Sequence, residues 1–208
     1  MPAPAVDALL FDLGNVLVEI DFERVFAAWA ASAGLRIEEV RERFAFDAVH
    51  RAFEVGRLDA AAFFEHVRGL LRVPLPDETL AGGWNEVFVG EVAAMAGLIA
   101  SVAGRVPLYV LSNTNSVHHV HWRARYAPIL QPFDAVFVSC ELGERKPDSA
   151  AFDAALRSIG AAPKRVGFFD DLAENVAGAR ALGMPSFVVS SAAQVRAAMA
   201  TLGLVGGR

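Results

Sequence analysis

The chain has 208 residues, 54 % of them hydrophobic, and its 19 basic and 24 acidic residues give a formal net charge of −5. This length and apolar content predict a globular protein with one domain, or with one domain and a small insert. Because no long basic run is present, nucleic acid and anionic membrane surfaces are disfavoured as main partners.

The chain ends and the cysteine content suggest a compartment. The apolar run near the N-terminus has no basic region before it and is too short for a signal peptide or a membrane span, so we expect a cytoplasmic protein without a membrane segment. Cys140 is the single cysteine, which excludes an internal disulfide framework and suits a reducing compartment. We expect the C-terminal tail, residues 202–208, to be frayed.

The N-terminal half predicts one strand followed by helices only. An apolar run beginning at Val6 ends in the carboxylate Asp12 and a Gly14-Asn15 turn, which is typical of a buried strand. Asp21 then offers a helix N-cap, and apolar residues recur with helical spacing after it. We expect further helices over 37–46, 48–55, 60–71, 77–89 and 91–103. No strand is expected between residues 19 and 103.

The C-terminal half alternates strands with helices. The predicted strands are 106–111, 135–138, 166–169 and 187–189, and the predicted helices are 116–126, 149–159 and 173–182. Such alternation favours right-handed βαβ units and a parallel sheet with both faces covered. The fold class is therefore α/β, a three-layer sandwich around a mainly parallel five-stranded sheet, with a helical insert after the first strand.

Polar residues gather where the predicted strands end. They are Asp12 after the first strand, then Ser112-Asn113, Lys146 and Asp170-Asp171 after the next three. Because parallel strands end at one edge of a sheet, these side chains should lie together. Three carboxylates would repel one another unless a cation lies among them, and Mg²⁺ is the usual one beside a phosphate.

The remaining groups of this set fit a phosphate. The Ser112 hydroxyl, the Asn113 amide and the Lys146 ammonium would hold its non-bridging oxygens. A carboxylate facing a metal-bound phosphate has an obvious task as nucleophile, forming an aspartyl phosphate that water then hydrolyses. We assign this task to Asp12.

The segments FDLGNVLVEID, LSNTN, ERKPD and FFDD resemble, in this order, the four motifs of the haloacid dehalogenase superfamily. The similarity is greatest to its alpha-D-glucose-1-phosphate phosphatase branch, which shares words such as GNVLVEIDFERV. The resemblance implies a Rossmann-like core of residues 1–18 and 104–208, with a helical cap and return helix over 19–103.

The resemblance also implies residue roles. Asp12 becomes nucleophile and Mg²⁺ ligand, with a metal contact from the Gly14 carbonyl. Ser112 and Asn113 become the phosphate clamp and Lys146 the charge-balancing lysine. Asp171 becomes a direct metal ligand supported by Asp170, and Asn175 would orient that acidic pair.

One position departs from most phosphatases of the superfamily. They carry a second aspartate two residues after the nucleophile as general acid and base, whereas this chain has Gly14, and loss of such help costs about 10²–10⁴ in rate. A substrate hydroxyl or His118 are candidates to supply the proton, although an exposed helix face is the competing interpretation for His118. His118, His119 and His121 lack a further ligand that would complete a zinc set.

Substrate contacts are expected from the cap. Phe46, His50 and Glu54 share a helical spacing before the Gly56 turn and are the candidates, with cap packing and solvent exposure as the alternative.

The predicted function is a Mg²⁺-dependent phosphatase for a small phosphorylated metabolite, such as the sugar phosphate glucose 1-phosphate, acting as monomer or homodimer. A metal-independent haloacid dehalogenase is one alternative, and the paired Asp170-Asp171 argue against it. A phosphometabolite-binding protein without turnover is the other, supported by Gly14.

Overall fold

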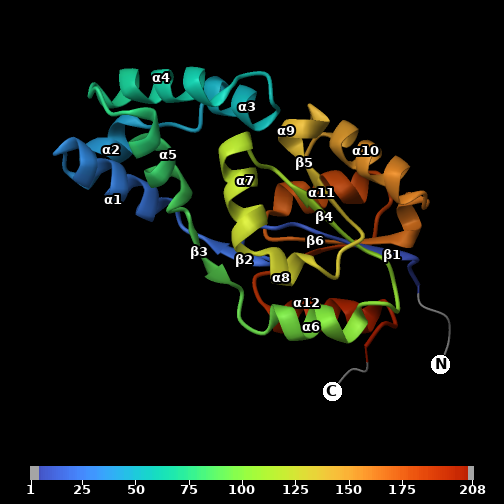
Figure 1. Cartoon of the computed structure of the whole chain (residues 1–208). Helices are drawn as coiled ribbons and strands as arrows, with labels where there is room; N and C mark the ends of the chain where they lie inside the picture. Colours follow the sequence, from blue (N-terminus) through green and yellow to red (C-terminus); the bar gives the residue numbers. More distant parts are fainter. Residues whose placement is uncertain (1–4, 206–208) are drawn as a thin grey trace.

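The structure is a computed structural model that describes residues 5–205 (Figure 1). Its centre is a five-stranded parallel sheet in the order β5-β4-β1-β6-β7. The strands are β1 (Ala8–Phe11), β4 (Leu108–Ser112), β5 (Ala135–Val138), β6 (Val166–Asp170) and β7 (Ser186–Val188). The predicted α/β fold and its five-stranded sheet are confirmed.

Strand β1 lies in the middle of the sheet and shows why the fold has three layers. Its four residues are all buried, and alternate side chains point to opposite faces. Leu9 and Phe11 join one apolar cluster with α6 (Met95–Val102) and α12 (Ala192–Thr201). Ala8 and Leu10 join a second cluster with α10 (Ser149–Ile159) and α11 (Ala173–Ala181). Figure 1 shows these helix pairs on opposite sides of the sheet.

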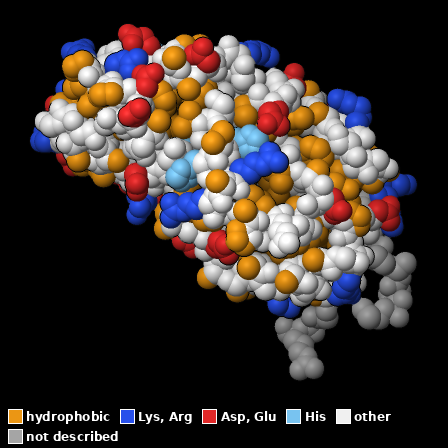
Figure 2. Space-filling view, in the orientation of Figure 1, with side chains coloured by type: hydrophobic (Ala, Val, Ile, Leu, Met, Phe, Trp, Pro, Cys, Tyr) orange, Lys and Arg blue, Asp and Glu red, His pale blue; other side chains and the backbone are white. Residues whose placement is uncertain are grey.

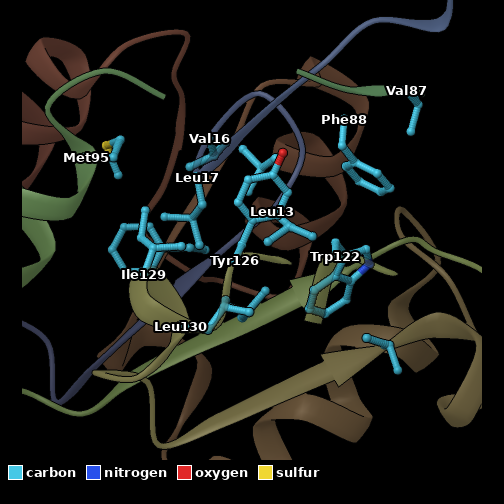
Figure 3. Close-up of a cluster of buried hydrophobic side chains, with 14 of the residues drawn as sticks. Leu13, Val16, Leu17, Val87, Phe88, Met95, Trp122, Tyr126, Ile129 and Leu130 are labelled. Atoms are coloured by element: carbon cyan, nitrogen blue, oxygen red, sulfur yellow. The ribbon is translucent and has the colours of Figure 1, made fainter. Parts of the chain in front are cut away.

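The segment directly after β1 is anchored by apolar packing. Leu13 and Leu17 are buried in the cluster that also contains Trp122 from α7 (Ser116–Arg125) and Leu130 from α8 (Ala127–Leu130). Figure 3 shows Leu13 between Tyr126 and Trp122. This packing holds the turn that carries the polar residues after β1.

A helical insert, residues 22–85, stands beside the sheet at the upper left of Figure 1. Its helices are α1 (Phe22–Ala33), α2 (Ile37–Arg43), α3 (Ala48–Glu54), α4 (Ala60–Leu71) and α5 (Asp77–Asn85). The insert has its own aromatic core, in which the rings of Trp29 and Trp84 stack with their centroids 5.5 Å apart. Trp29 Nε1 donates to Leu80 O at 3.0 Å, which satisfies its polar atom inside this core.

The chain enters and leaves the insert through a two-stranded antiparallel ribbon of β2 (Val18–Ile20) and β3 (Phe88–Glu91). The expectation of no strand between residues 19 and 103 is therefore wrong. The two strands have three and four residues and pair across about seventy positions of sequence, so neither carries a recognisable local pattern.

Some predicted boundaries also need correction. Helix α2 ends at Arg43 instead of continuing to Phe46, α5 ends at Asn85 before β3, and α6 begins at Met95 instead of Glu91. Helix α9 (Ser139–Leu142) was not expected.

The tail prediction fails for the part that the structure describes. Leu202 and Leu204 are buried against the first apolar cluster, so residues 202–205 are not frayed. Residues 206–208 of the predicted tail lie outside the described residues.

Among residues 5–205, no helix is long and apolar enough to cross a membrane. Figure 2 shows acidic and basic side chains interspersed over one face.

Candidate active site

The carboxyl ends of the central strands bring three carboxylates together. Asp12 follows β1, Asp170 is the last residue of β6, and Asp171 comes next. Each offers an oxygen, and these three atoms lie within 4.8 Å of one another. In the described part of the chain this is the one group of His, Cys, Asp or Glu side chains with metal-site spacing, so a zinc set on the α7 histidines is not formed.

Lys146, in the loop between α9 and α10, bridges two of these carboxylates. Its Nζ donates to Asp12 Oδ1 and to Asp170 Oδ2, each at 2.6 Å, and its side chain is 1 % exposed. Burial alone would lower the pKa of Lys146, but the Asp12 and Asp170 charges hold that pKa above its ordinary value. The lysine therefore stays charged and fixes the orientation of Asp12.

Asn113 holds the backbone of this lysine. Its Nδ2 donates to Lys146 O at 2.8 Å, and Lys146 N donates to its Oδ1 at 2.9 Å. Both polar atoms of the Asn113 side chain thus position the lysine, and because Asn113 also lines the cavity, its phosphate contact stays a prediction. Ser112, at the end of β4, is 4 % exposed and lines the cavity beside the carboxylates.

Asp170 is a fully buried anchor. Besides Lys146 it accepts Leu172 N at 2.8 Å, and Asn175 Nδ2 donates to its two oxygens at 3.0 and 3.1 Å. Asn175 thus contacts Asp170 and not the pair. Because the oxygens of Asp170 already accept several bonds, this carboxylate is built to hold Lys146 more than to bind a ligand.

Asp171 is held from the other side of the site. Asn15 Nδ2 donates to Asp171 Oδ2 at 3.0 Å, while Asn15 Oδ1 accepts Ile20 N at 3.1 Å. Asn15 has φ 54, a left-handed conformation that asparagine tolerates better than most residues. Burial raises the pKa of Asp171, and the Asn15 hydrogen bond opposes this rise.

The carboxylates repel one another strongly in the protein alone. Burial raises the pKa of Asp12 to about 7, and the charges of Asp170 and Asp171 add to this effect against the opposing charge of Lys146. An all-oxygen set with excess negative charge suits a hard divalent cation, which would relieve the repulsion. Asp12 and Asp171 are placed to hold such an ion, and Gly14 lines the same cavity.

These residues form one wall of a cavity of about 310 Å³. Side chains of the helical insert and of the β3 ribbon complete it, among them His50, Glu54, Val87 and Phe88. The cavity therefore lies where the insert meets the edge of the sheet. Its size suits a small molecule.

The expected cap residues divide into two groups. His50 and Glu54 are buried and line both this cavity and an outer cleft next to it. Phe46 is 48 % exposed, and it lines the outer cleft but not the cavity that holds the carboxylates. Arg145, which lies beside Lys146, reaches the same place, with its Nε 3.4 Å from Glu54 Oε2.

His118 has a different setting from either interpretation. It is 6 % exposed, so the exposed helix face is wrong. Asn115 Nδ2 and His118 Nδ1 are 3.1 Å apart, and His118 Nε2 is 3.0 Å from Trp84 O. Burial lowers its pKa to about 3, so the neutral ring accepts from Asn115 and donates to Trp84. With both nitrogens engaged, His118 supports the cavity wall and has no free proton for a substrate.

Comparison with known proteins agrees with this geometry. The family of haloacid dehalogenase-like hydrolases matches residues 6–183. The chain belongs to this family. Over 198 residues it is 26 % identical to the D-ribitol-5-phosphate phosphatase of Bacteroides thetaiotaomicron, covering 90 % of this chain and 94 % of that protein. It is 24 % identical over 197 residues to Phosphatase MT3486 of Mycobacterium tuberculosis, covering 92 % and 91 %.

A solved structure is also similar over most of the chain. A haloacid dehalogenase family enzyme of Bacteroides thetaiotaomicron, crystallised as a magnesium complex, superposes with a TM-score of 0.80 at 25 % identity, covering 90 % of this chain and 95 % of that one. The superfamily resemblance read from the four motifs is thereby confirmed.

Two site residues of this haloacid dehalogenase-like hydrolase were missed in the sequence. Asn15 was read as a turn residue, although an asparagine after glycine is a known choice for positive φ and can bond its neighbours. Arg145 received no role from the sequence, whereas its side chain is 27 % exposed and lines the cavity. Nothing in the sequence shows that the helical insert covers it.

Proposed function

We propose that the chain is a Mg²⁺-dependent phosphatase that hydrolyses a small phosphomonoester through an aspartyl phosphate on Asp12. The observation that carries this proposal is the buried Asp12 carboxylate, which Lys146 contacts at 2.6 Å beside Asp171 in a cavity of about 310 Å³. The related enzyme crystallised with magnesium supports the choice of ion.

The residues divide the work as follows. Lys146 keeps Asp12 oriented and balances its charge, so that the carboxylate attacks phosphorus in line with the leaving oxygen. The Ser112 hydroxyl is placed to donate to a phosphate oxygen. Asp12, Asp171 and the Gly14 carbonyl, with Asp170 behind them, would hold Mg²⁺, which supplies charge neutralisation for the phosphate when bound.

The cavity limits the substrate. A volume of about 310 Å³ admits a sugar phosphate or a sugar-alcohol phosphate, and glucose 1-phosphate remains the example proposed from the sequence. The similarity to a D-ribitol-5-phosphate phosphatase adds pentitol phosphates to the class. Polar insert side chains such as His50 and Glu54 are placed to meet the hydroxyl groups of such molecules.

A phosphate-release assay tests the function. The purified protein is incubated with hexose, pentose and pentitol phosphates, with Mg²⁺ or with EDTA, beside two variants. We expect Mg²⁺-dependent release by the parent and by Asp153→Asn, an exposed carboxylate of α10, and a loss of at least about 10³-fold in Asp12→Asn because the nucleophile is gone.

Other results would contradict the proposal. Release by Asp12→Asn at the parent rate would remove the nucleophile assignment. Chloride release from a 2-halo acid, insensitive to EDTA, would favour the dehalogenase alternative. Tight binding of a sugar phosphate without any release would favour a binding protein.

A further inference from the structure

The position where most phosphatases of the superfamily carry their general acid is a glycine in this chain, Gly14. A Cβ atom built on Gly14 would lie 3.0 Å from Ile20 Cδ1 and 3.9 Å from Asp12 Oδ2. A side chain at position 14 would therefore press against the end of the Ile20 side chain, from β2. Because Gly14 itself offers no acid, the proton for the leaving oxygen comes from another wall of the cavity or from a hydroxyl group of the substrate.

Most polar groups on the other walls are unsuited to deliver it. Both ring nitrogens of His118 are engaged within the protein. Burial lowers the pKa of His50 to about 4, so its ring is neutral near neutral pH. Among the described residues that line the cavity outside the carboxylate cluster, Glu54 is the one remaining carboxyl group.

Glu54 lines the same cavity as the carboxylate cluster. It is the last residue of α3, it is 9 % exposed, and it lies between the cavity and the outer cleft. Its Oε2 and Arg145 Nε are buried without a hydrogen-bond partner in the described part of the chain, although they are 3.4 Å apart. A buried polar atom without a partner is costly, so both groups are ready to bond a substrate.

The electrostatics agree with this placement. Burial raises the pKa of Glu54, against the opposing charges of Arg145, Arg51 and Lys146. His50 Nδ1 is 3.8 Å from Glu54 Oε2 and is neutral, so it leaves the carboxyl group without a counter-charge on that side.

The backbone of Glu54 is fastened to the sheet edge, although the residue belongs to the helical insert. Ser139 Oγ lies 2.6 Å from Glu54 O and 2.9 Å from Thr114 O, and it accepts Thr114 N at 2.8 Å. Ser139 is fully buried at the start of α9. This contact joins the end of α3 to the loop after β4, next to Ser112.

We propose that Glu54 is the proton carrier of the reaction, in place of the acid that is absent at Gly14. The proposal rests on the phosphatase function above. In the first step the Asp12 carboxylate bonds to phosphorus, the bond from phosphorus to the alcohol oxygen breaks, and that oxygen takes the proton of the Glu54 carboxyl group. In the second step water attacks phosphorus, Glu54 takes back a proton, and the Asp12 carboxylate and phosphate are released.

The test uses two substrates of similar size that differ in their need for a proton. The leaving group of ethyl phosphate is ethoxide, a strong base that needs a proton as it departs. The leaving group of acetyl phosphate is acetate, which needs no proton. In Glu54→Gln, with Mg²⁺ present, we expect kcat/KM to fall at least about 10²-fold for ethyl phosphate and to stay within about threefold for acetyl phosphate. The ratio kcat/KM reports the steps up to departure of the alcohol or acetate, so it isolates the first proton transfer.

A matched control and a third substrate separate the alternatives. Glu42→Gln removes an exposed carboxylate from α2 of the same insert. It should leave kcat/KM unchanged for both ethyl phosphate and acetyl phosphate. An equal loss on ethyl and acetyl phosphate in Glu54→Gln would overturn the proton-carrier role in favour of a structural one. A loss confined to a pentitol phosphate would overturn it in favour of hydroxyl binding. No phosphate release by the parent from any of the three would overturn the phosphatase function itself, and the proton-carrier role with it.

Discussion

The contact between the helical insert and α9 can be tested at Gly56. This residue follows α3 with φ +68, and a Cβ on it would lie 2.2 Å from the carbonyl oxygen of Cys140. That oxygen belongs to the backbone of a short helix and cannot swing aside. In Gly56→Ala the end of α3, with Glu54 two residues before, must therefore move away from the edge of the sheet.

Gly34 provides a matched control for the backbone conformation. It ends α1 with φ +65, but a Cβ there would have no atom within 4 Å. Gly34→Ala thus carries only the left-handed penalty of about 1–2 kcal/mol. Gly56→Ala carries the same penalty and an overpacking cost of about 1–3 kcal/mol, so its free energy of unfolding should be lower by about 2–5 kcal/mol.

Urea unfolding followed by circular dichroism measures this difference, and phosphate release measures its consequence. We expect Gly34→Ala to retain the parental kcat/KM for a sugar phosphate, while Gly56→Ala loses about 10²-fold because the insert side of the cavity is displaced. Free energies of unfolding that agree within about 0.5 kcal/mol for the two variants, with equal activities, would refute the proposed contact.

Two further predictions concern the hydrogen bonds around the site. Asn15→Gly keeps the positive φ but removes the amide that bonds Asp171 and Ile20. The Mg²⁺ concentration for half-maximal phosphate release should therefore rise about 10–100-fold. An unchanged concentration would contradict the positioning role of Asn15. His118 titrates near 6.5 when unfolded and near 3 when folded, so the unfolded chain alone takes up a proton as pH falls between these values. The free energy of unfolding should therefore decrease below about pH 6.5 by up to about 1.4 kcal/mol per unit. His118→Gln should show a shallower decrease in pH-dependent urea unfolding, with His50 unchanged in both proteins; parallel curves would contradict the neutral, bonded ring.

The sheet and its carboxylates were predictable because their signals are local. Each strand is a short apolar run that ends in a polar residue, and the parallel arrangement follows from the alternation with helices. Asp12, Asp170 and Asp171 come together for this reason, whereas Lys146 lies beyond α9 and is also held there by Asn113. The helical insert was likewise visible from apolar residues with helical spacing and from the N-cap Asp21, whose side chain accepts a hydrogen bond from Glu23 N.

Features that depend on contacts distant in sequence were not predictable. The β2 and β3 ribbon pairs Ile20 with Phe88, and neither short segment shows a strand pattern by itself. The role of Asn113 also depends on a distant partner, because its amide binds the backbone of Lys146 33 positions away. An amide next to a predicted phosphate site is read as a ligand when that partner is unknown.

The β2 and β3 ribbon also bears on the chemistry, because Ile20 of β2 packs beside Gly14, the position at which this chain lacks an acid. In our proposal the proton comes from Glu54 of α3, in the insert, and not from the loop after β1. Proton transfer therefore depends on the insert being docked against the edge of the sheet. Gly56→Ala should accordingly lose activity on ethyl phosphate and retain more of it on acetyl phosphate, as Glu54→Gln does, since both remove the carboxyl group from the leaving oxygen. An equal loss on the two substrates in Gly56→Ala alone would instead mean that docking of the insert also shapes the phosphate site.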